Sequence, residues 1–394
     1  MKILCLAWFY YPKIGGVESV SKIINGKLIE KGHEVIVVTS GEKEEFEMVD
    51  GVKVIRTPKL IPGQRIGPEF KIWARDLISQ NFDLVHCHNF SYNFNPEKSL
   101  EILKVCRELK IPNIEHAHNA QLKCSEKTRE IILSSWSRII CVSNFVKKRF
   151  IELGVDSKKI KVIHNPLDLD LFDPKKVDED EVKKLKLDIA KEGEVIIFFP
   201  GRVVRMSLDE FGEQKQFKSV VYALKILKEK GIKFKLIIPS VKGSMSLVDC
   251  RENKREKIVD DFLKENGIYE NVYIFPRDLK LENMPLVYQA CDIVCLPSLK
   301  ETFGMVYLEG QAMGKVVIGA RSGGVSEVID EGKTGFLIEE KNVKELANYL
   351  EKLSTHKKLR EVMGKRGKKR VKELFNKEKM IKNLLKIYKN ILKN

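Results

Sequence analysis

The stretch DIVCLPSLKETFGMVYLEGQAMGKVVIGA, residues 292–320, decides how the chain folds. It opens with a short apolar run at 292–298, passes through a loop into a helical pattern from Gly304, and ends in a β-branched run at 315–320. Two strands joined through a helix form a parallel pair, the building unit of a doubly wound sheet. Glu301 lies in the predicted loop and Glu309 on the predicted helix.

The same alternation of strand and helix runs through both halves of the chain. We expect strands at 2–8, 34–39, 52–57, 83–88, 112–118, 138–143 and 161–165, and again at 194–201, 233–239, 271–276, 292–298, 315–320 and 335–339. Amphipathic helical patterns lie between most of them, among them 17–31, 99–109, 127–134 and 144–153. The sequence therefore predicts an α/β fold made of two Rossmann-like, doubly wound parallel sheets.

The length of 394 residues exceeds what one ordinary core serves, so we expect two domains. A polar, acidic, proline-bearing segment near 172–188 is typical of a linker. We place an N-terminal domain at 1–172 and a C-terminal domain at 173–375, with a last helix at about 376–394 packing back on the first domain. Two such domains facing each other make a cleft, and their sheets bind ligands at the carboxyl ends of the strands.

Composition narrows the function classes. The hydrophobic share of 43% and the charged share of 32% are ordinary for a globular protein, and no apolar run is long enough to span a membrane. The N-terminus reads directly as a strand, without the pattern of a signal peptide, so we expect a cytoplasmic protein. The net charge of +16 fits nucleic acid, an anionic membrane or a phosphorylated substrate. The basic segment 356–372 has no nucleic-acid-binding motif, which argues against nucleic acid.

The eight cysteines fit a reducing compartment. Only Cys291 and Cys295 stand close together, with three residues between them, and no pair of histidines or further cysteines accompanies them at zinc-finger spacing. We interpret them as reduced and mostly buried thiols.

Two groups of residues follow strands of the first half. Gly15 and Gly16 close the loop after the first strand and open a helix, where a backbone without Cβ atoms can approach an anionic ligand. Glycines in such a turn also occur for steric reasons alone. The loop has no G-x-G-x-x-G pattern, which counts against a nicotinamide or flavin enzyme.

Four of the seven histidines lie near neighbouring strand ends. Alternation along a strand puts His86 and His88 on one face, and His116 and His118 on one face of the next strand. A metal site, ordinary buried histidines and a polar wall of an active site are the three interpretations. We favour the polar wall and expect no metal.

In the second half, Arg202 follows a strand and a glycine, and Lys215 lies downstream. An arginine fork and a lysine point charge suit a diphosphate, although isolated basic residues are often only solvated. Glu301 and Glu309 have three interpretations: the acid and nucleophile of a glycoside hydrolase, two contacts to one ligand, or surface charge. With a helix N-terminus between them, donors for phosphate stand beside acceptors for hydroxyl groups, as a nucleotide sugar requires.

These motifs together resemble the retaining glycosyltransferases of family 4, the group 1 glycosyl transferases with the GT-B fold. The resemblance covers nearly the whole chain and is most specific at 292–338. The first half matches through GGVESV (15–20), KGHEVIVVTS (31–40), DLVHCHN (83–89), IPNIEHAH (111–118), CVSNFV (141–146) and IHNPLDLDLF (163–172).

The resemblance implies a role for each site residue. Glu309 would hold the ribose hydroxyls of the donor and Glu301 would lie against the transferred sugar, so the pair would not do hydrolase chemistry. Phe303, Gly304, Met305 and Val306 would line the sugar and diphosphate. Arg202 and Lys215 would bind phosphate, with Gly15 and Gly16 nearby. His118 would stand near the reacting carbon, and His88 and Asn89 on the acceptor side.

The sequence departs from the family pattern at three places. Lys215 lies thirteen residues after Arg202, about twice the usual gap, so 205–213 looks inserted and Arg205 is an alternative phosphate ligand. Gln216 follows the lysine where glycine is usual. PSVKGSMS (239–246) replaces a Gly-x-Gly loop.

The implied reaction is transfer of a sugar from a nucleotide-diphosphate donor to an acceptor hydroxyl of a glycan or lipid-linked molecule, with retention of configuration. No cofactor or metal is expected; the pair Asp168 and Asp170 resembles a metal motif but falls in the linker. The rivals are a nucleotide-sugar epimerase of the same fold and a non-catalytic nucleotide-sugar-binding protein. Basic clusters at 147–149 and 357–372 lead to the hypothesis of peripheral contact with anionic lipid at the inner face of the cell membrane.

Overall fold

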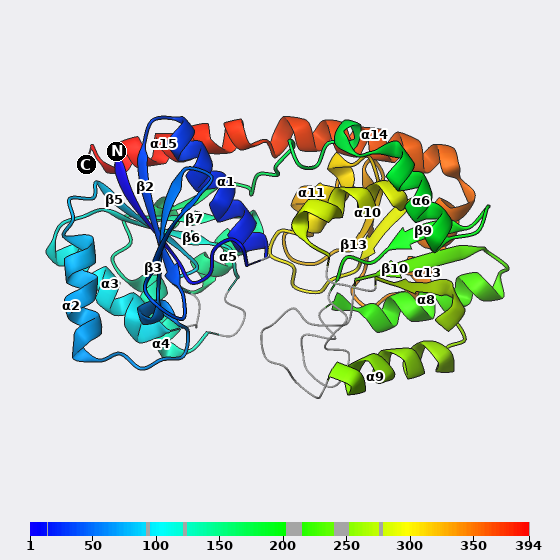
Figure 1. The fold of residues 1–394 in the computed structure, drawn as a ribbon, viewed down its shortest axis with the longest axis horizontal. Coiled ribbons are helices and arrows are strands. Elements are labelled where there is room, and N and C mark those ends of the chain that lie inside the picture. The colour runs from blue at the N-terminus through cyan, green and yellow to red at the C-terminus, as the bar shows by residue number, and fades with distance from the viewer. Residues whose placement is uncertain are drawn as a thin grey trace. The chain divides into compact units, whose positions relative to one another are not determined.

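The structure is a computed structural model that describes residues 1–13, 15–91, 95–120, 124–201, 215–239, 252–275 and 279–393, with side chains from 257 onward in the segment 252–275. The chain divides into two compact units (Figure 1). Unit 1 comprises Met1–Pro166 and Phe375–Asn394, and unit 2 comprises Leu167–Leu374. The sequence had placed this boundary at 172 and had assigned the last helix to the first domain.

Unit 1 is a sheet of eight strands in the order β3-β4-β2-β1-β5-β6-β7-β8. Its elements are β1 (Lys2–Ala7), α1 (Gly16–Glu30), β2 (Glu34–Ser40), β3 (Glu45–Val49), β4 (Val52–Thr57), α2 (Pro68–Ile78), β5 (Leu84–His88), α3 (Pro96–Glu108), β6 (Asn113–Ala117), α4 (Glu126–Leu133), β7 (Arg138–Cys141), α5 (Asn144–Glu152), β8 (Ile160–Val162) and α15 (Lys377–Ile391).

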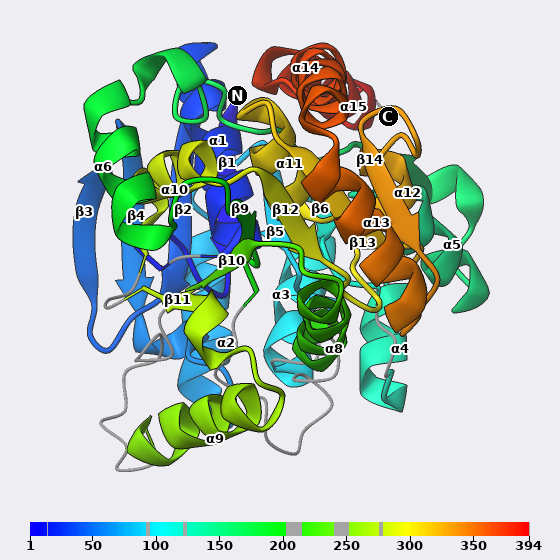
Figure 2. The same cartoon turned by 90° about the vertical axis from the view of Figure 1, so that its right-hand side faces the viewer.

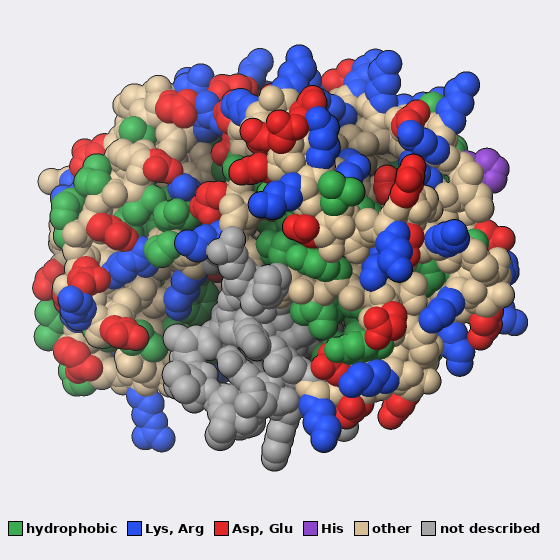
Figure 3. All heavy atoms as spheres, turned by 45° about the vertical axis from the view of Figure 1, so that its right-hand side comes forward, with side chains coloured by type: hydrophobic (Ala, Val, Ile, Leu, Met, Phe, Trp, Pro, Cys, Tyr) green, Lys and Arg blue, Asp and Glu red, His purple; other side chains and the backbone are tan. Residues whose placement is uncertain are grey.

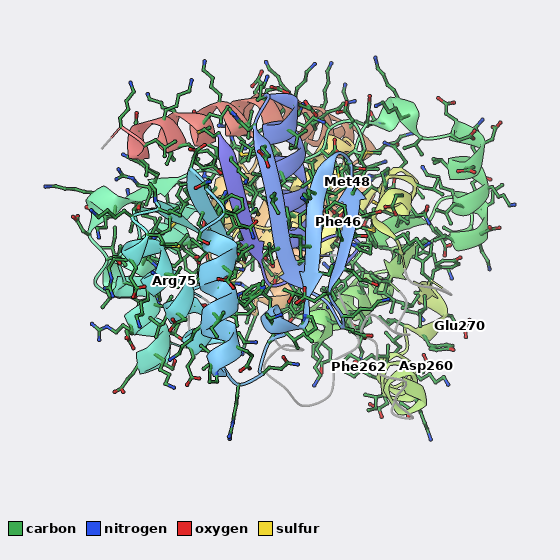
Figure 4. All side chains as sticks on the ribbon, turned by 60° about the vertical axis from the view of Figure 1, so that its left-hand side comes forward. Phe46, Met48, Arg75, Asp260, Phe262 and Glu270 are labelled. Carbon is green, nitrogen blue, oxygen red and sulfur yellow. The ribbon has the colours of Figure 1, made fainter. Side chains whose placement is uncertain are left out.

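The central strands of unit 1 are parallel, and every residue of β5 and β6 is buried. Both faces of these strands are covered, so the polar side chains that they carry, among them His86, His88, Glu115 and His116, are buried as well. The exception is β3, an antiparallel edge strand that the sequence analysis did not predict. Phe46 and Met48 of β3 are each 59% exposed, and both are labelled in Figure 4.

The last helix, α15, packs beside α1 in unit 1 (Figure 1). Met380, Ile381, Leu384 and Tyr388 recur every three or four positions and form its buried stripe. Lys27 of α1 also pairs with Glu378 of α15 at 2.8 Å. The apolar stripe fixes the helix, because exposed ion pairs contribute little.

Unit 2 is a parallel sheet of six strands in the order β11-β10-β9-β12-β13-β14. Its elements are α6 (Glu179–Ile189), β9 (Val195–Phe198), α8 (Phe217–Glu229), β10 (Phe234–Ile238), α9 (Glu252–Glu265), β11 (Val272–Ile274), α10 (Met284–Ala290), β12 (Ile293–Leu296), α11 (Met305–Ala312), β13 (Val316–Ala320), α12 (Val325–Val328), β14 (Gly335–Ile338), α13 (Val343–Thr355) and α14 (Lys357–Leu374). Helices α8 and α13 lie side by side (Figure 2).

We predicted a linker at 172–188. This prediction is wrong for the second half of the segment, because α6 begins at Glu179. Asp178 caps this helix by accepting hydrogen bonds from the backbone N–H groups of Asp180 and Glu181, at 2.8 and 3.0 Å. Acidic residues in a first turn also favour the helix dipole. The same acidic composition therefore favours a helix start here, and the polar composition alone could not distinguish it from a linker.

Candidate active site

A polar cluster lies at the end of β12 in unit 2. The ammonium group of Lys215 donates hydrogen bonds to Oε2 of Glu301 at 2.7 Å and to Oγ of Ser298 at 3.2 Å. The side chains of Lys215 and Glu301 are 32% and 20% exposed, so the pair is accessible. Sequence analysis had selected Lys215 and Glu301 separately, and the structure brings them together. It had not selected Ser298, whose position directly after the strand was the available signal.

A neighbouring turn holds the backbone around Glu301. The N–H of Gly324 donates to the carbonyl of Glu301 at 2.7 Å, and the N–H of Lys300 donates to Oγ of Ser322 at 2.7 Å. Gly323 has a φ of +62°, and a Cβ atom there would collide with the carbonyl of Glu301. The glycine is thus needed for both its conformation and its lack of a side chain. This turn therefore fixes the backbone position from which the side chain of Glu301 extends.

Helix α11 follows this loop and begins after Gly304, whose φ of +98° is left-handed. No side chain caps this helix start, which leaves backbone N–H groups available for a ligand. Met305 and Val306 in its first turn are half-buried, whereas the side chain of Phe303 is only 2% exposed. The backbone of 303–306 is therefore the part that can face a ligand.

Glu309 lies on the second turn of α11 and is half-buried. Tyr288 of α10 donates its hydroxyl proton to Oε2 of Glu309 at 2.7 Å. Burial raises the pKa of Glu309 to about 7, and the hydrogen bond from Tyr288 lowers it in part. Tyr288 was not selected from the sequence, because it stands on another helix with no motif around it.

In unit 1, the ends of β5 and β6 join His88, Asn89 and His118. Nδ1 of His88 lies 3.0 Å from Nε2 of His118, a hydrogen bond whose direction depends on the tautomers. Oδ1 of Asn89 accepts from the backbone N–H of His118 at 2.8 Å, and Asn89 itself has a φ of +58°. Asparagine tolerates this left-handed conformation better than most residues. The residues that we assigned to the reacting centre and to the acceptor side are therefore in direct contact.

Glu115, absent from the sequence analysis, supports the loop after Asn89. Its carboxylate accepts from the backbone N–H groups of Phe90 and Ser91, both at 3.1 Å, and from the hydroxyl of Ser91 at 2.6 Å. The pKa of Glu115 is raised to about 7 because the side chain is completely buried. Trp8 adds a hydrogen bond from Nε1 to the carbonyl of Asn89 at 3.1 Å and stacks on Phe90 at 4.7 Å.

Gly15 is the N-cap of α1 and Gly16 its first residue, as expected for the glycine loop. Gly15 has an extended φ of 178°, a backbone conformation that residues other than glycine also adopt. Several predicted features lie outside the described residues: Arg202, Arg205, the inserted segment 205–213 and residues 240–246 of the variant loop. Trp8, Tyr10 and Phe90 are at most 2% exposed and pack inside unit 1. Asp168 accepts from the N–H of Asp170 at 3.1 Å within a turn.

Two models of known protein families match this chain, and together they cover most of its length. "Glycosyl transferases group 1" matches residues 183–370, and "Glycosyltransferase Family 4" matches residues 14–171. A solved structure of Anabaena HepE in complex with UDP and glucose superposes with a TM-score of 0.76 at 17% identity, covering 98% of each chain. Fold and sequence thus define a GT-B glycosyltransferase.

Curated relatives extend over the same length. An uncharacterized glycosyltransferase of Methanocaldococcus jannaschii is 26% identical, with 99% of this chain and 98% of the relative covered. The N-acetyl-alpha-D-glucosaminyl L-malate synthase of Bacillus anthracis is 24% identical, with 98% and 96% covered. The chain belongs to the group 1, or family 4, glycosyltransferases.

Proposed function

We propose that this glycosyltransferase moves a sugar from a nucleoside diphosphate donor to an acceptor hydroxyl, with retention of the anomeric configuration. The observation that carries the proposal is the cluster of Lys215, Ser298 and Glu301 at the end of β12, directly before the N-terminus of α11. A cation and uncapped backbone N–H groups suit a diphosphate, and carboxylates beside them suit sugar and ribose hydroxyls.

The donor would lie along α11. Its ribose hydroxyls would donate to Glu309, whose other partner, Tyr288, already orients the carboxylate. Its diphosphate would meet Lys215 and the start of the helix, with Arg202 as a further ligand. The transferred sugar would then stand against Glu301. The presence of UDP and glucose in the complex of the structural relative HepE supports a donor of this kind.

The reaction would be a front-face displacement. The bond between the anomeric carbon and the diphosphate oxygen breaks while the acceptor oxygen bonds to the same face of that carbon. The leaving diphosphate takes the proton of the acceptor hydroxyl, and Lys215 stabilises its developing charge. His118, with His88 and Asn89 fixing its ring and backbone, would position the reacting carbon and the acceptor.

A screen of nucleotide sugars tests the proposal. At least one UDP-, GDP- or ADP-sugar should raise the melting temperature of the protein, and Glu309→Ala should abolish that shift. With the selected donor and an acceptor mixture, nucleoside diphosphate should be released and the product should keep the donor's anomeric configuration by NMR. An epimerised sugar without any acceptor would support the epimerase instead. Binding without release in every acceptor mixture would support a non-catalytic binding protein.

We further propose reversible contact with anionic lipid at the inner face of the cell membrane, where a lipid-linked acceptor would be found. No helix among the described residues has the length and apolar character needed to cross a bilayer. On α14, Lys357, Lys358, Lys365, Arg366 and Lys369 are exposed, whereas Arg370 donates to the carbonyls of Glu327 and Val328. Figure 3 shows lysine and arginine side chains interspersed with acidic ones on the face that it draws.

Sedimentation with vesicles tests the membrane contact. Binding should rise with the anionic lipid fraction and fall with added salt, because screening weakens exposed charges. The double variant Lys365→Glu/Arg366→Glu should sediment less, and Lys225→Glu on α8 serves as the matched control. Equal recovery in the supernatant with neutral and anionic vesicles at low salt would refute the contact and leave the sugar-transfer proposal untouched.

A further inference from the structure

Four histidine rings stand side by side on one face of β5 and β6. The ring centroids of His86 and His88 are 4.6 Å apart on β5, and those of His116 and His118 are 4.5 Å apart on β6. Across the strands, His86 and His116 are separated by 5.4 Å and His88 and His116 by 5.2 Å. All four side chains are at most 5% exposed. The reaction proposed above uses only the outer pair, His88 and His118.

Only some of the ring nitrogens in this cluster have a hydrogen-bond partner among the described residues. Nδ1 of His86 lies 2.6 Å from the hydroxyl of Tyr388 on α15, and Nδ1 of His88 lies 3.0 Å from Nε2 of His118. Nε2 of His86, Nε2 of His88 and both ring nitrogens of His116 have no hydrogen-bond partner among the described residues. A buried polar group without a partner destabilises the fold, so four such atoms in one cluster require an explanation.

Three of the four rings offer ligand nitrogens that lie close to one another. Ligand atoms of His86, His88 and His116 all lie within 4.8 Å of one another. Burial lowers the pKa of all three rings, and a neutral imidazole has a lone pair on one nitrogen with which it can bind a metal ion. A ring whose Nδ1–H donates to a neighbour presents Nε2 as a ligand, the arrangement typical of metal-binding histidines. Tyr388 and His118 are in position to accept those protons.

We propose that His86, His88 and His116 bind one zinc-type transition metal ion inside unit 1. Imidazole nitrogens suit Zn²⁺, Co²⁺, Ni²⁺ and Cu²⁺, whereas Mg²⁺ and Ca²⁺ prefer oxygen ligands. The nearby carboxylate, Glu115, neighbours His116 in β6 and therefore points to the opposite face of the sheet. Zn–N bonds of about 2.0–2.1 Å require ligand atoms about 3.4 Å apart, so the rings tilt toward one another on binding.

The ion would tie β5 and β6 together and, through the hydrogen bond of His86 to Tyr388, connect them to α15. The ion would also keep the proton of His88 on Nδ1, so that His88 donates a hydrogen bond to Nε2 of His118. The role is structural and orienting: the ion would bind no substrate. The inference rests on unit 1 alone and does not depend on the proposed sugar transfer.

Metal content tests the site directly. The full chain is produced without a histidine tag in zinc-supplemented medium, passed over a chelating resin and analysed by inductively coupled plasma mass spectrometry. Wild type and the control His356→Gln, an exposed histidine of unit 2, should each retain about one equivalent of zinc. His116→Thr, which places a β-branched residue in the strand, and His86→Gln should each retain at least tenfold less.

Two further measurements guard against misfolded variants. The zinc absorption edge of wild type should show a nitrogen shell at about 2.0–2.1 Å with imidazole scattering. Protein grown with cobalt should show visible d–d bands that disappear in His116→Thr while its far-UV circular dichroism stays native. Wild type holding no more zinc than His116→Thr would overturn the proposal, and so would bound zinc without an imidazole shell. The four nitrogens would then be served by buried water.

Discussion

Lys215 places its ammonium nitrogen 2.7 Å from Oε2 of Glu301, although the two residues are 86 positions apart in the sequence. The pair stands where β12 ends and α11 is about to begin. Each charge neutralises the other in the absence of a ligand, and each becomes available when a donor enters: the cation for phosphate and the carboxylate for sugar hydroxyls. This contact is the basis of the first prediction.

Lys215→Ala should weaken binding of the donor's nucleoside diphosphate by about 1.5–3 kcal/mol, or about 10- to 150-fold, because a charged hydrogen bond to phosphate is lost. Binding of the bare nucleoside should not change. Calorimetric titration of both ligands measures the difference, with Lys225→Ala on α8 as the control. If the affinity for the diphosphate stays at the wild-type value, phosphate binding belongs to other residues, with Arg202 and Arg205 the first to examine.

Glu309 should make the stability of the protein depend on pH. Its folded-state pKa of about 7 lies above the reference value of 4.5, so the folded protein holds this proton more tightly. The resulting contribution to stability is fully present below pH 4.5 and is lost as the pH rises through about 7. Relative to wild type, Glu309→Gln should gain on the order of 2 kcal/mol between pH 4.5 and pH 8.

Urea unfolding of both proteins at the two pH values measures this gain, with the exposed Glu282→Gln as control. An unchanged difference between Glu309→Gln and wild type across the pH range would mean that the carboxyl of Glu309 titrates normally in the folded protein.

His118→Ala should lower turnover by about 10²–10³-fold while the affinity for the donor changes little, because the ring is expected to act at the reacting carbon. His33→Gln, in the same unit, is the control. Initial rates and donor titrations on the same preparations separate the two effects. A variant with wild-type turnover would move this role to another residue, and His116 would be examined next.

Turnover should persist when excess EDTA is added at the start of the assay, because Lys215 and the N-terminus of α11 already serve the diphosphate. A metal buried among the histidines of unit 1 would not contact the diphosphate, and slow exchange would protect it during a short assay. Immediate loss of turnover that manganese or magnesium restores would contradict this prediction. It would return attention to Asp168 and Asp170, whose turn also brings Lys176 within 3.9 Å of Asp170.

Much of the fold could be predicted because parallel strands covered on both faces leave a strong apolar signal. The expected strand at 83–88 is β5 (Leu84–His88), and the expected helix at 17–31 is α1 (Gly16–Glu30). Strand β3 was missed because it is short and carries Glu45 and Glu47, and glutamate is depleted in strands. Helix α2 was missed because two prolines and two glycines precede it. Edge elements are specified by pairing with a neighbour more than by local composition.

The residue types of the candidate site could also be predicted, but not their contacts. Alternation along β5 and β6 correctly put His86 and His88 on one face, and the ring contacts with His116 and His118 confirm that both pairs share it. The hydrogen bonds of Glu115 to the loop after Asn89 and of Tyr388 to His86 depend on register and on a helix 302 positions away. Such long-range contacts leave no local pattern to read.

The central claim is that Glu309 binds the ribose of a nucleotide donor, and a double-mutant cycle tests it most directly. Wild type and Glu309→Ala are titrated with the selected nucleoside diphosphate and with its 2′,3′-dideoxy analogue. We predict that wild type prefers the ribose form by about 1.5–3 kcal/mol and that Glu309→Ala binds both forms with the same weak affinity. An equal preference for ribose in both proteins would contradict the account, because the carboxylate of Glu309 would then not be the group that holds the donor.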